Sequence, residues 1–190
     1  MQANLLILHP SAADETVQAE TLLPALRDIG FIGETMDFQG ESHYRPGEEF
    51  LQLVTFLGCS PVVSLGEPGK TGEEFCHIGL HAPTREPVLI AGANAKAPRC
   101  PFCRQPDGEW QRRISPGEPV RNAWTCPHCG QQSPAHKLNW RQSAGIGRTF
   151  IVVWGIFEGE AVPSEQLLST LENTGAGPWT YFYYRGDAPL

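Results

Sequence analysis

Short apolar runs alternate with polar, turn-rich segments along the first ninety residues of the chain. Residues 4–8 and 31–38 are mostly apolar and are predicted to be strands. Between them, apolar residues recur at roughly helical spacing over residues 15–29, and Pro24 inside this segment predicts a kink or a later start of the helix. The chain is therefore predicted to open with a β-α-β unit.

The alternation continues to residue 91 and returns near the end of the chain. Polar residues 39–46 are predicted to be a loop, and residues 47–57 a helix with a broad apolar face. Further strands are predicted at residues 75–81, 87–91, 149–158 and 179–184, and a last helix at residues 164–171. These elements predict an α+β (or α/β) protein with a mixed sheet and about three helices. The 20 Gly and 17 Pro exclude a long helical bundle.

The pattern breaks after residue 91, where apolar runs give way to Pro, Arg, Trp and four cysteines. We interpret residues 96–141 as a small inserted module, and residues 1–95 and 142–190 as one scaffold domain. The charge changes along nearly the same boundary. Residues 96–148 hold nine Lys and Arg against three Asp and Glu, and the rest of the chain holds five against eighteen. The net charge of −7 therefore conceals a basic module on an acidic scaffold.

Four of the six cysteines form two Cys-x-x-Cys pairs, Cys100-Pro-Phe-Cys103 and Cys126-Pro-His-Cys129, with 22 residues between them. Each pair forms a tight turn that can direct two sulfurs at one metal ion. Two such turns supply the tetrahedral set of soft ligands that structural zinc requires. The sequence therefore predicts a four-cysteine metal site.

The stretch from Trp124 to Gly130 resembles the zinc-ribbon or rubredoxin-like knuckle family, and the resemblance extends over residues 98–137. It implies that the four cysteines are metal ligands, with zinc favoured over iron. Gly130 permits the positive φ that such knuckles use after the second cysteine, whereas Arg104 stands at the equivalent place in the first pair. Because four thiolates leave no open position for water, the site is expected to be structural rather than catalytic.

A redox role is the main alternative for the second pair. Cys-Pro-His-Cys also occurs in strongly oxidising proteins of the thioredoxin fold, where the pair opens a helix that stabilises the thiolate. Here Gly130 begins the sequence Gly-Gln-Gln-Ser-Pro, which does not favour a helix, and a second pair lies in range. Metal binding is therefore the preferred interpretation, with reduced thiols or a disulfide also left open. The other two cysteines, Cys59 and Cys76, are predicted to be buried apolar residues.

Two further segments carry candidate chemistry. Residues 65–71 suggest a phosphate-binding loop, but Ser64 stands where its first glycine belongs and no helix follows, so an exposed turn around Lys70 is preferred. His77 and His81 lie on one face of a predicted strand, about 13 Å apart, too far to share a metal ion. His9 ends the first strand and is a candidate to join them in a pocket at the strand ends.

Aromatic and cationic side chains are mixed along the module, a combination that can bind phosphates and stack on bases. The candidate partner-binding residues are Trp110, Arg112, Arg113, Arg121, Arg141 and Arg148. The alternative is that the Trp residues cover a small core while the Arg residues pair with the acidic scaffold, and this alternative is preferred.

These observations predict a cytoplasmic, zinc-binding protein. The chain has no apolar run near the roughly 18 residues of a membrane span and no signal-peptide pattern, so no membrane contact is expected. A non-enzymatic binding or adaptor role is preferred, with a macromolecular partner that is a protein rather than nucleic acid. The alternative is an enzyme with a strand-end pocket near His9, His77 and His81, in which the ribbon only supports a lid.

Overall fold

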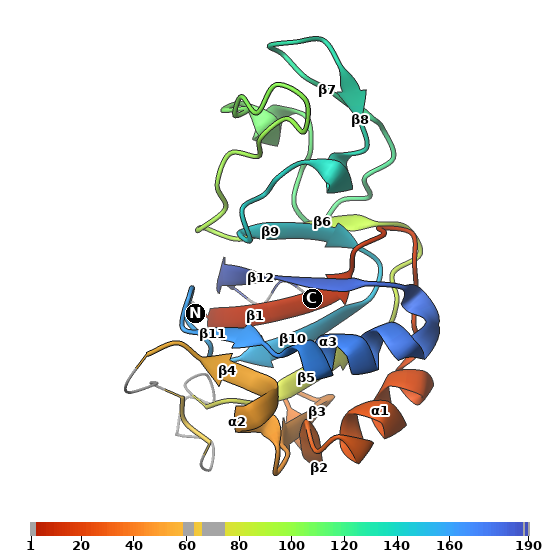
Figure 1. The fold of residues 1–190 in the computed structure, drawn as a ribbon, viewed down its shortest axis with the longest axis vertical. Coiled ribbons are helices and arrows are strands. Elements are labelled where there is room, and N and C mark those ends of the chain that lie inside the picture. The colour runs from red at the N-terminus through yellow and green to blue at the C-terminus, as the bar shows by residue number, and fades with distance from the viewer. Residues whose placement is uncertain (1–2, 59–62, 66–74, 188, 190) are drawn as a thin grey trace.

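The central sheet has six strands, and every neighbouring pair in it is antiparallel (Figure 1). The computed structural model describes residues 3–58, 63–65, 75–187 and 189. In spatial order the strands are β12 (Trp179–Gly186), β1 (Ala3–Pro10), β10 (Phe150–Trp154), β5 (Ile78–His81), β3 (Glu41–Pro46) and β2 (Ile32–Phe38). The α+β class is confirmed. The central sheet is antiparallel rather than mixed. Three other strands separate β1 from β2, and no two neighbouring strands in this sheet are parallel.

Three helices pack on one face of the sheet. They are α1 (Ala19–Asp28), α2 (Phe50–Leu53) and α3 (Glu165–Leu171), which continues into a short π-helical turn, η3 (Glu172–Ala176). Leu26 and Leu167 of these helices share a core with Leu6 of β1 and with the alternate apolar residues of β10. β1 and β10 are buried along almost their whole length, which explains why their sequences are continuously apolar.

Two predicted elements differ in the structure. Residues 39–46 contain strand β3 instead of a loop, because their backbone pairs with β2 on one side and β5 on the other. The helix predicted at 47–57 is a single turn that passes directly into β4 (Val54–Phe56), which pairs with β11 (Ala161–Pro163). Helix α1 begins at Ala19, the later start that Pro24 had allowed. Cys59, Lys70 and most of the candidate phosphate loop lie outside the described residues.

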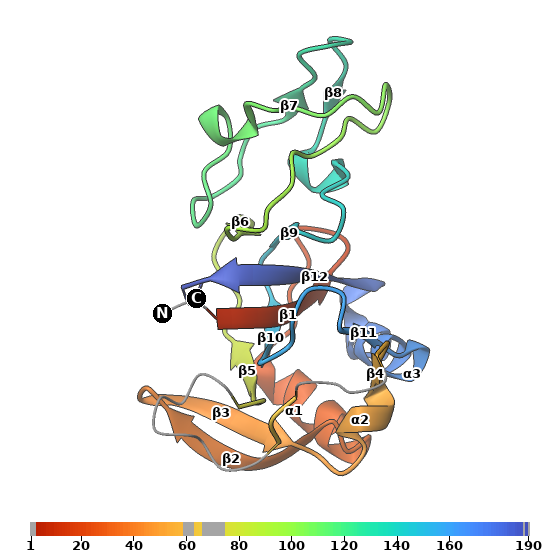
Figure 2. The same ribbon diagram turned by 90° about the vertical axis from the view of Figure 1, so that its left-hand side faces the viewer.

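The cysteine-rich part of the chain connects β6 (Val88–Ala91) to β9 (Ala144–Gly147). These two strands pair with each other in a separate two-stranded sheet. The cysteine-rich part contains β7 (Trp124–Thr125) paired with β8 (Gln132–Ser133), and the 3₁₀ turns η1 (Trp110–Arg112) and η2 (Ala135–Lys137). Figures 1 and 2 show this part projecting beyond the β12 edge of the sheet. We call residues 96–141 the module and the remainder the scaffold. Among the described residues, no helix has the length and apolar character needed to cross a membrane.

Candidate metal centre

Four sulfur atoms lie together at the outer part of the module. The ligand atoms of the four cysteines are all within 4.8 Å of one another. Cys100 Sγ is 3.8 Å from Cys129 Sγ, and Cys103 Sγ is 3.6 Å from Cys126 Sγ. A tetrahedral ion with metal–sulfur bonds of about 2.3 Å would separate its ligands by about 3.8 Å, whereas a disulfide needs about 2.0 Å. The cluster can therefore hold one metal ion.

The two cysteine pairs form knuckles with the same hydrogen bonds. In the first knuckle, Phe102 N–H donates to Cys100 Sγ, and Arg104 N–H donates to the Cys100 carbonyl. In the second, His128 N–H donates to Cys126 Sγ, and Gly130 N–H donates to the Cys126 carbonyl. The four sulfurs are thus presented by two equivalent backbone turns.

Three of the four thiols share protons unequally in the absence of a metal ion. Burial raises the pKa of Cys126, but the N–H groups of Cys129 and His128, together with the thiols of Cys129 and Cys103, outweigh burial and lower it to about 7. A backbone N–H lowers the pKa of Cys103 and of Cys129, but burial and the neighbouring thiols outweigh it and raise both, so Cys126 is the thiol that most readily forms a thiolate among these three.

Each knuckle ends with a residue in the left-handed region. Gly130 has a φ of 73° and Arg104 a φ of 63°. Arg104 therefore adopts the same backbone conformation as the glycine, which explains how the first pair forms a knuckle without one.

This equivalence predicts opposite effects of two substitutions. Gly130→Ala should destabilise the protein by about 1 kcal/mol, because an L-residue resists this φ although no atom lies within 4 Å of the added Cβ. Arg104→Gly should raise or preserve stability, since it removes that cost from the first knuckle. Thermal unfolding of the metal-loaded proteins measures both. A lower melting temperature for Arg104→Gly than for Gly130→Ala would contradict the equivalence.

Three tryptophans form the interior of the module. Trp110, Trp124 and Trp140 are each no more than 5% exposed, and Trp110 packs edge-on against Trp140 with ring centroids 5.2 Å apart. Trp110 was a candidate for contacting a partner, but the structure places it in this core. This agrees with the alternative interpretation of the sequence, in which the Trp residues cover a small core. The same core includes Leu89 and Ile146 of β6 and β9, so module and scaffold share one continuous apolar cluster.

A buried carboxylate connects the two halves of the module. Asp107 is 2% exposed; it accepts hydrogen bonds from Trp124 Nε1 at 2.9 Å and Glu109 N–H at 3.1 Å, and it pairs with Arg113. Burial raises the pKa of Asp107, but these donors outweigh burial and hold it below its ordinary value. Sequence analysis did not single out Asp107, because one acidic residue in a basic stretch gives no pattern.

The candidate arginines have different surroundings. Arg121 pairs with Glu86 of the scaffold through two hydrogen bonds of 2.5 and 2.9 Å. Arg148 donates to the Thr84 and Asp14 carbonyls, and Arg141 to the Ala97 carbonyl. Arg113 pairs with Asp107, and Arg112 pairs with Glu109 of the same turn. The side chains of Arg112 and Arg121 remain 77% and 70% exposed. Most of these arginines therefore hold the module together or attach it to the scaffold.

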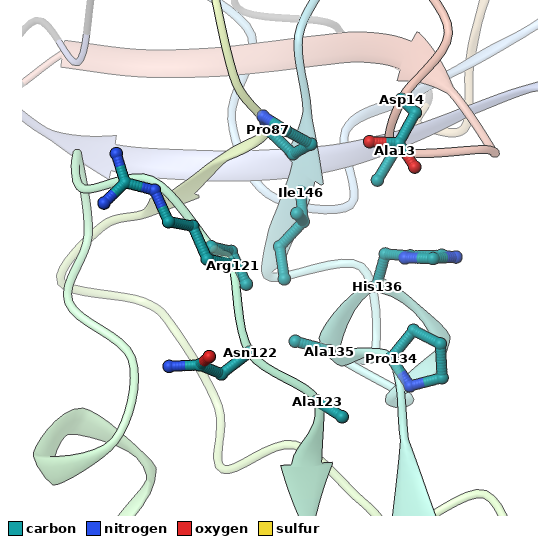
Figure 3. A pocket seen from close by; sticks show the side chains of 11 residues that line it. Ala13, Asp14, Pro87, Arg121, Asn122, Ala123, Pro134, Ala135, His136 and Ile146 are labelled. Carbon is teal, nitrogen blue, oxygen red and sulfur yellow. The ribbon is translucent and has the colours of Figure 1, made fainter.

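A cavity of about 330 Å³ lies where the module meets the scaffold (Figure 3). Ala135 of η2 and Ile146 of β9 form its middle, and His136 and Asp14 stand at one side. The guanidinium of Arg121 is directed away from Ile146, toward its partner Glu86. The ion pair between Arg121 and Glu86 therefore bridges module and scaffold beside this cavity rather than within it.

The histidines singled out in the sequence do not form one site. His77 and His81 approach a third histidine, His43 of β3, with ring centroids 5.0 and 6.3 Å from it. His9 instead lies next to Phe150, with the two ring centroids 5.9 Å apart, and it lines a separate cleft. Sequence analysis missed His43 because residues 39–46 were predicted to be a loop.

The environment of His77 is enclosed and aromatic. Its ring is stacked between Phe75 and Trp154, with centroids 4.5 and 5.0 Å away, and it is fully buried. His77 Nε2 and His43 Nδ1 are buried without a hydrogen-bond partner in the described part of the chain. Burial lowers the pKa of His77 to about 4, so the ring is neutral at neutral pH. The cysteines are the one group of three or more side chains among the described residues that meets the spacing of a metal site.

Comparison with protein-family models, with curated proteins and with solved structures yields no significant match to this chain. Its function is therefore argued from its own residues.

Proposed function

We propose that the four cysteines bind one zinc ion with a structural role, and that the module it stabilises is the recognition surface of a non-enzymatic binding or adaptor protein. The observation that carries the proposal is the set of four sulfurs at tetrahedral spacing on two equivalent knuckles. Four protein ligands leave no position for a water or a substrate, which favours stability over catalysis as the role of the ion. Because zinc undergoes no redox reaction, it does not need shielding from solvent, which is compatible with the exposure of Cys129.

The exposed side chains of the first knuckle suit a protein partner with an acidic surface. Phe102 is 59% exposed, and the side chain of Arg104 is exposed, with no hydrogen-bond or ion-pair partner for its guanidinium in the described residues. An apolar side chain beside a free guanidinium is typical of protein contact sites, where Arg and aromatic residues are enriched. The acidic scaffold would repel the long polyanion of a nucleic acid more than a folded protein with a local acidic patch.

Metal analysis and partner capture test the two parts separately. Native mass spectrometry should show one zinc per chain, and cobalt substitution should give the absorption bands of a tetrahedral tetrathiolate site. A red iron chromophore in the isolated protein would show that the site binds iron instead of zinc.

Partner capture tests recognition. The double variant Phe102→Ser/Arg104→Gly should lose a partner that the wild type and the scaffold control Arg85→Gln both retain. Equal capture by all three proteins would contradict the recognition surface. Binding of a labelled single-stranded RNA with a steep salt dependence would make nucleic acid the partner instead.

A further inference from the structure

A cleft of about 340 Å³ lies between the inner end of the module and the β1–β12 side of the sheet. Strand β9 runs beside β12 in this region (Figure 1). The module contributes Lys137, Asn139 and Arg141, and the sheet contributes His9, Ser11 and Thr180. The cleft has the size of a site for a small molecule, at the junction of two structural units where such sites are common.

The charge of the cleft is positive. Lys137 and Arg141 line it, and none of its described lining residues is Asp or Glu. The side chain of Lys137 is exposed, and its ammonium group has no hydrogen-bond or ion-pair partner in the described part of the chain. Arg141 uses one guanidinium nitrogen to donate to the Ala97 carbonyl at 3.0 Å, which positions the group and leaves its other N–H donors free. One Lys and one Arg without a neighbouring carboxylate match a dianion better than a single carboxylate.

The backbone of the cleft is held in an unfavourable conformation. Arg141 and Gln142 are consecutive residues with φ of 53° and 55°, and neither is a glycine. Two hydrogen bonds hold them: Arg141 N–H donates to Asn139 Oδ1, and Tyr183 N–H of β12 donates to the Gln142 carbonyl. Such conformations cost free energy and concentrate at functional sites, so we expect this turn to belong to a functional site.

His9 lines the cleft and has a ring nitrogen that is an unused acceptor. The ring is 6% exposed, and its Nδ1 lies 2.8 Å from the Pro10 carbonyl, which can only accept, so Nδ1 carries the hydrogen. Nε2 is then a lone-pair acceptor, and it has no partner in the described residues. Burial lowers the pKa of His9 to about 4, which keeps Nε2 an acceptor at neutral pH. Gly145 makes room for the ring, because a Cβ there would lie 2.6 Å from Nε2.

From this arrangement we propose that the cleft binds a small phosphate monoester that carries a neighbouring hydroxyl group. The phosphate interacts with Lys137 and Arg141, and the hydroxyl donates its hydrogen to His9 Nε2. The proposal does not depend on the partner of the outer knuckle surface, since Phe102 and Arg104 take no part in the cleft.

Calorimetric titration of the metal-loaded protein at neutral pH tests the phosphate contact. Glycerol 3-phosphate is the probe, and propyl phosphate, which lacks the hydroxyls, is its comparator. Lys137→Gln and Arg141→Gly should each weaken glycerol 3-phosphate about tenfold, since each removes a charged hydrogen bond; Gly also tolerates the left-handed φ. Arg85→Gln removes the same charge from an exposed scaffold site and should leave the affinity unchanged. Absence of binding, or equal weakening by Arg85→Gln, would overturn the proposal.

Two substitutions of His9 test the hydroxyl contact. Wild type should prefer glycerol 3-phosphate to propyl phosphate by about tenfold. His9→Asn keeps a polar atom near the position of Nδ1 but none at Nε2, and should abolish this preference. His9→Gln, whose amide reaches the position of Nε2, should retain part of it. Should either variant unfold, the imidazole NMR signals of wild-type His9 decide: they should shift with glycerol 3-phosphate, and unchanged signals would refute the contact.

Discussion

Replacing Cys126 by Ser is expected to release the metal ion and unfold the module. Few backbone hydrogen bonds join the two knuckles in the described residues, so a bound ion would link them directly. In zinc-finger peptides structural zinc supplies about 10–16 kcal/mol of apparent binding free energy, which is comparable to the whole stability of a domain. Loss of the module core also uncovers Leu89 and Ile146 of the scaffold, since they belong to the same apolar cluster. The damage should therefore extend into β6 and β9.

Metal content by mass spectrometry and thermal unfolding by circular dichroism measure this effect together. We expect loss of the ion and a fall in melting temperature of roughly 10 °C or more, because about 2–4 °C corresponds to each kcal/mol in a domain of this size. Cys76→Ala is the matched control: Cys76 is a buried cysteine of the scaffold core outside the four-sulfur cluster, so this variant should keep its metal. Full metal content and an unchanged melting curve for Cys126→Ser would refute the metal centre.

Mild acid is expected to destabilise the protein through its buried histidines. Burial lowers the pKa of His9 and of His77 from 6.5 to about 4, and both side chains are at least 94% buried. Below pH 6.5 the unfolded chain binds protons that the folded chain does not, so the free energy of unfolding decreases as the pH falls toward 4. Between pH 6.5 and 5 the two histidines together should remove about 3 kcal/mol.

Denaturant unfolding at several pH values in this window measures the loss, because carboxylates with ordinary pKa values remain mostly ionised there. His77→Phe keeps the stacked ring between Phe75 and Trp154 and removes the titrating nitrogen. Its stability should therefore fall by clearly less than that of the wild type over the same range, although not to zero, because burial also lowers the pKa of His9 and His81 to about 4 and both still titrate. An equal slope in His77→Phe would show that His77 does not cause the loss.

The four-cysteine cluster could be predicted because its geometry is local. Two sulfurs separated by two residues reach one ion whatever the rest of the chain does, so the Cys-x-x-Cys spacing was sufficient. The apolar runs of β1 and β10 were equally informative, since a strand buried on both faces needs apolar side chains throughout. The helix from Glu165 to Leu171 matches the one predicted at residues 164–171, and Ser164 caps it by accepting a hydrogen bond from Leu167 N–H.

Strand β3 could not be predicted from its own residues. Glu41, Ser42 and Arg45 are polar, and the segment becomes a strand because β2 and β5 pair with its backbone. The helix predicted after it failed for a related reason: Val54 and Thr55 pair with β11, more than a hundred residues later in the chain. In both cases a long-range pairing overrides the local preference of the side chains.

The sequence by itself determined the α+β class, the central strands and the four cysteines of the metal centre, because each depends on the spacing of a few neighbouring residues. Only the tertiary structure decided the antiparallel order of the sheet, the burial of Trp110 and the role of Asp107 as the hub of the module. It alone also brought His43 to His77 and placed His9 in a cleft with Lys137 and Arg141. These features join residues far apart along the chain, and no spacing in the sequence records which distant side chains the fold brings together.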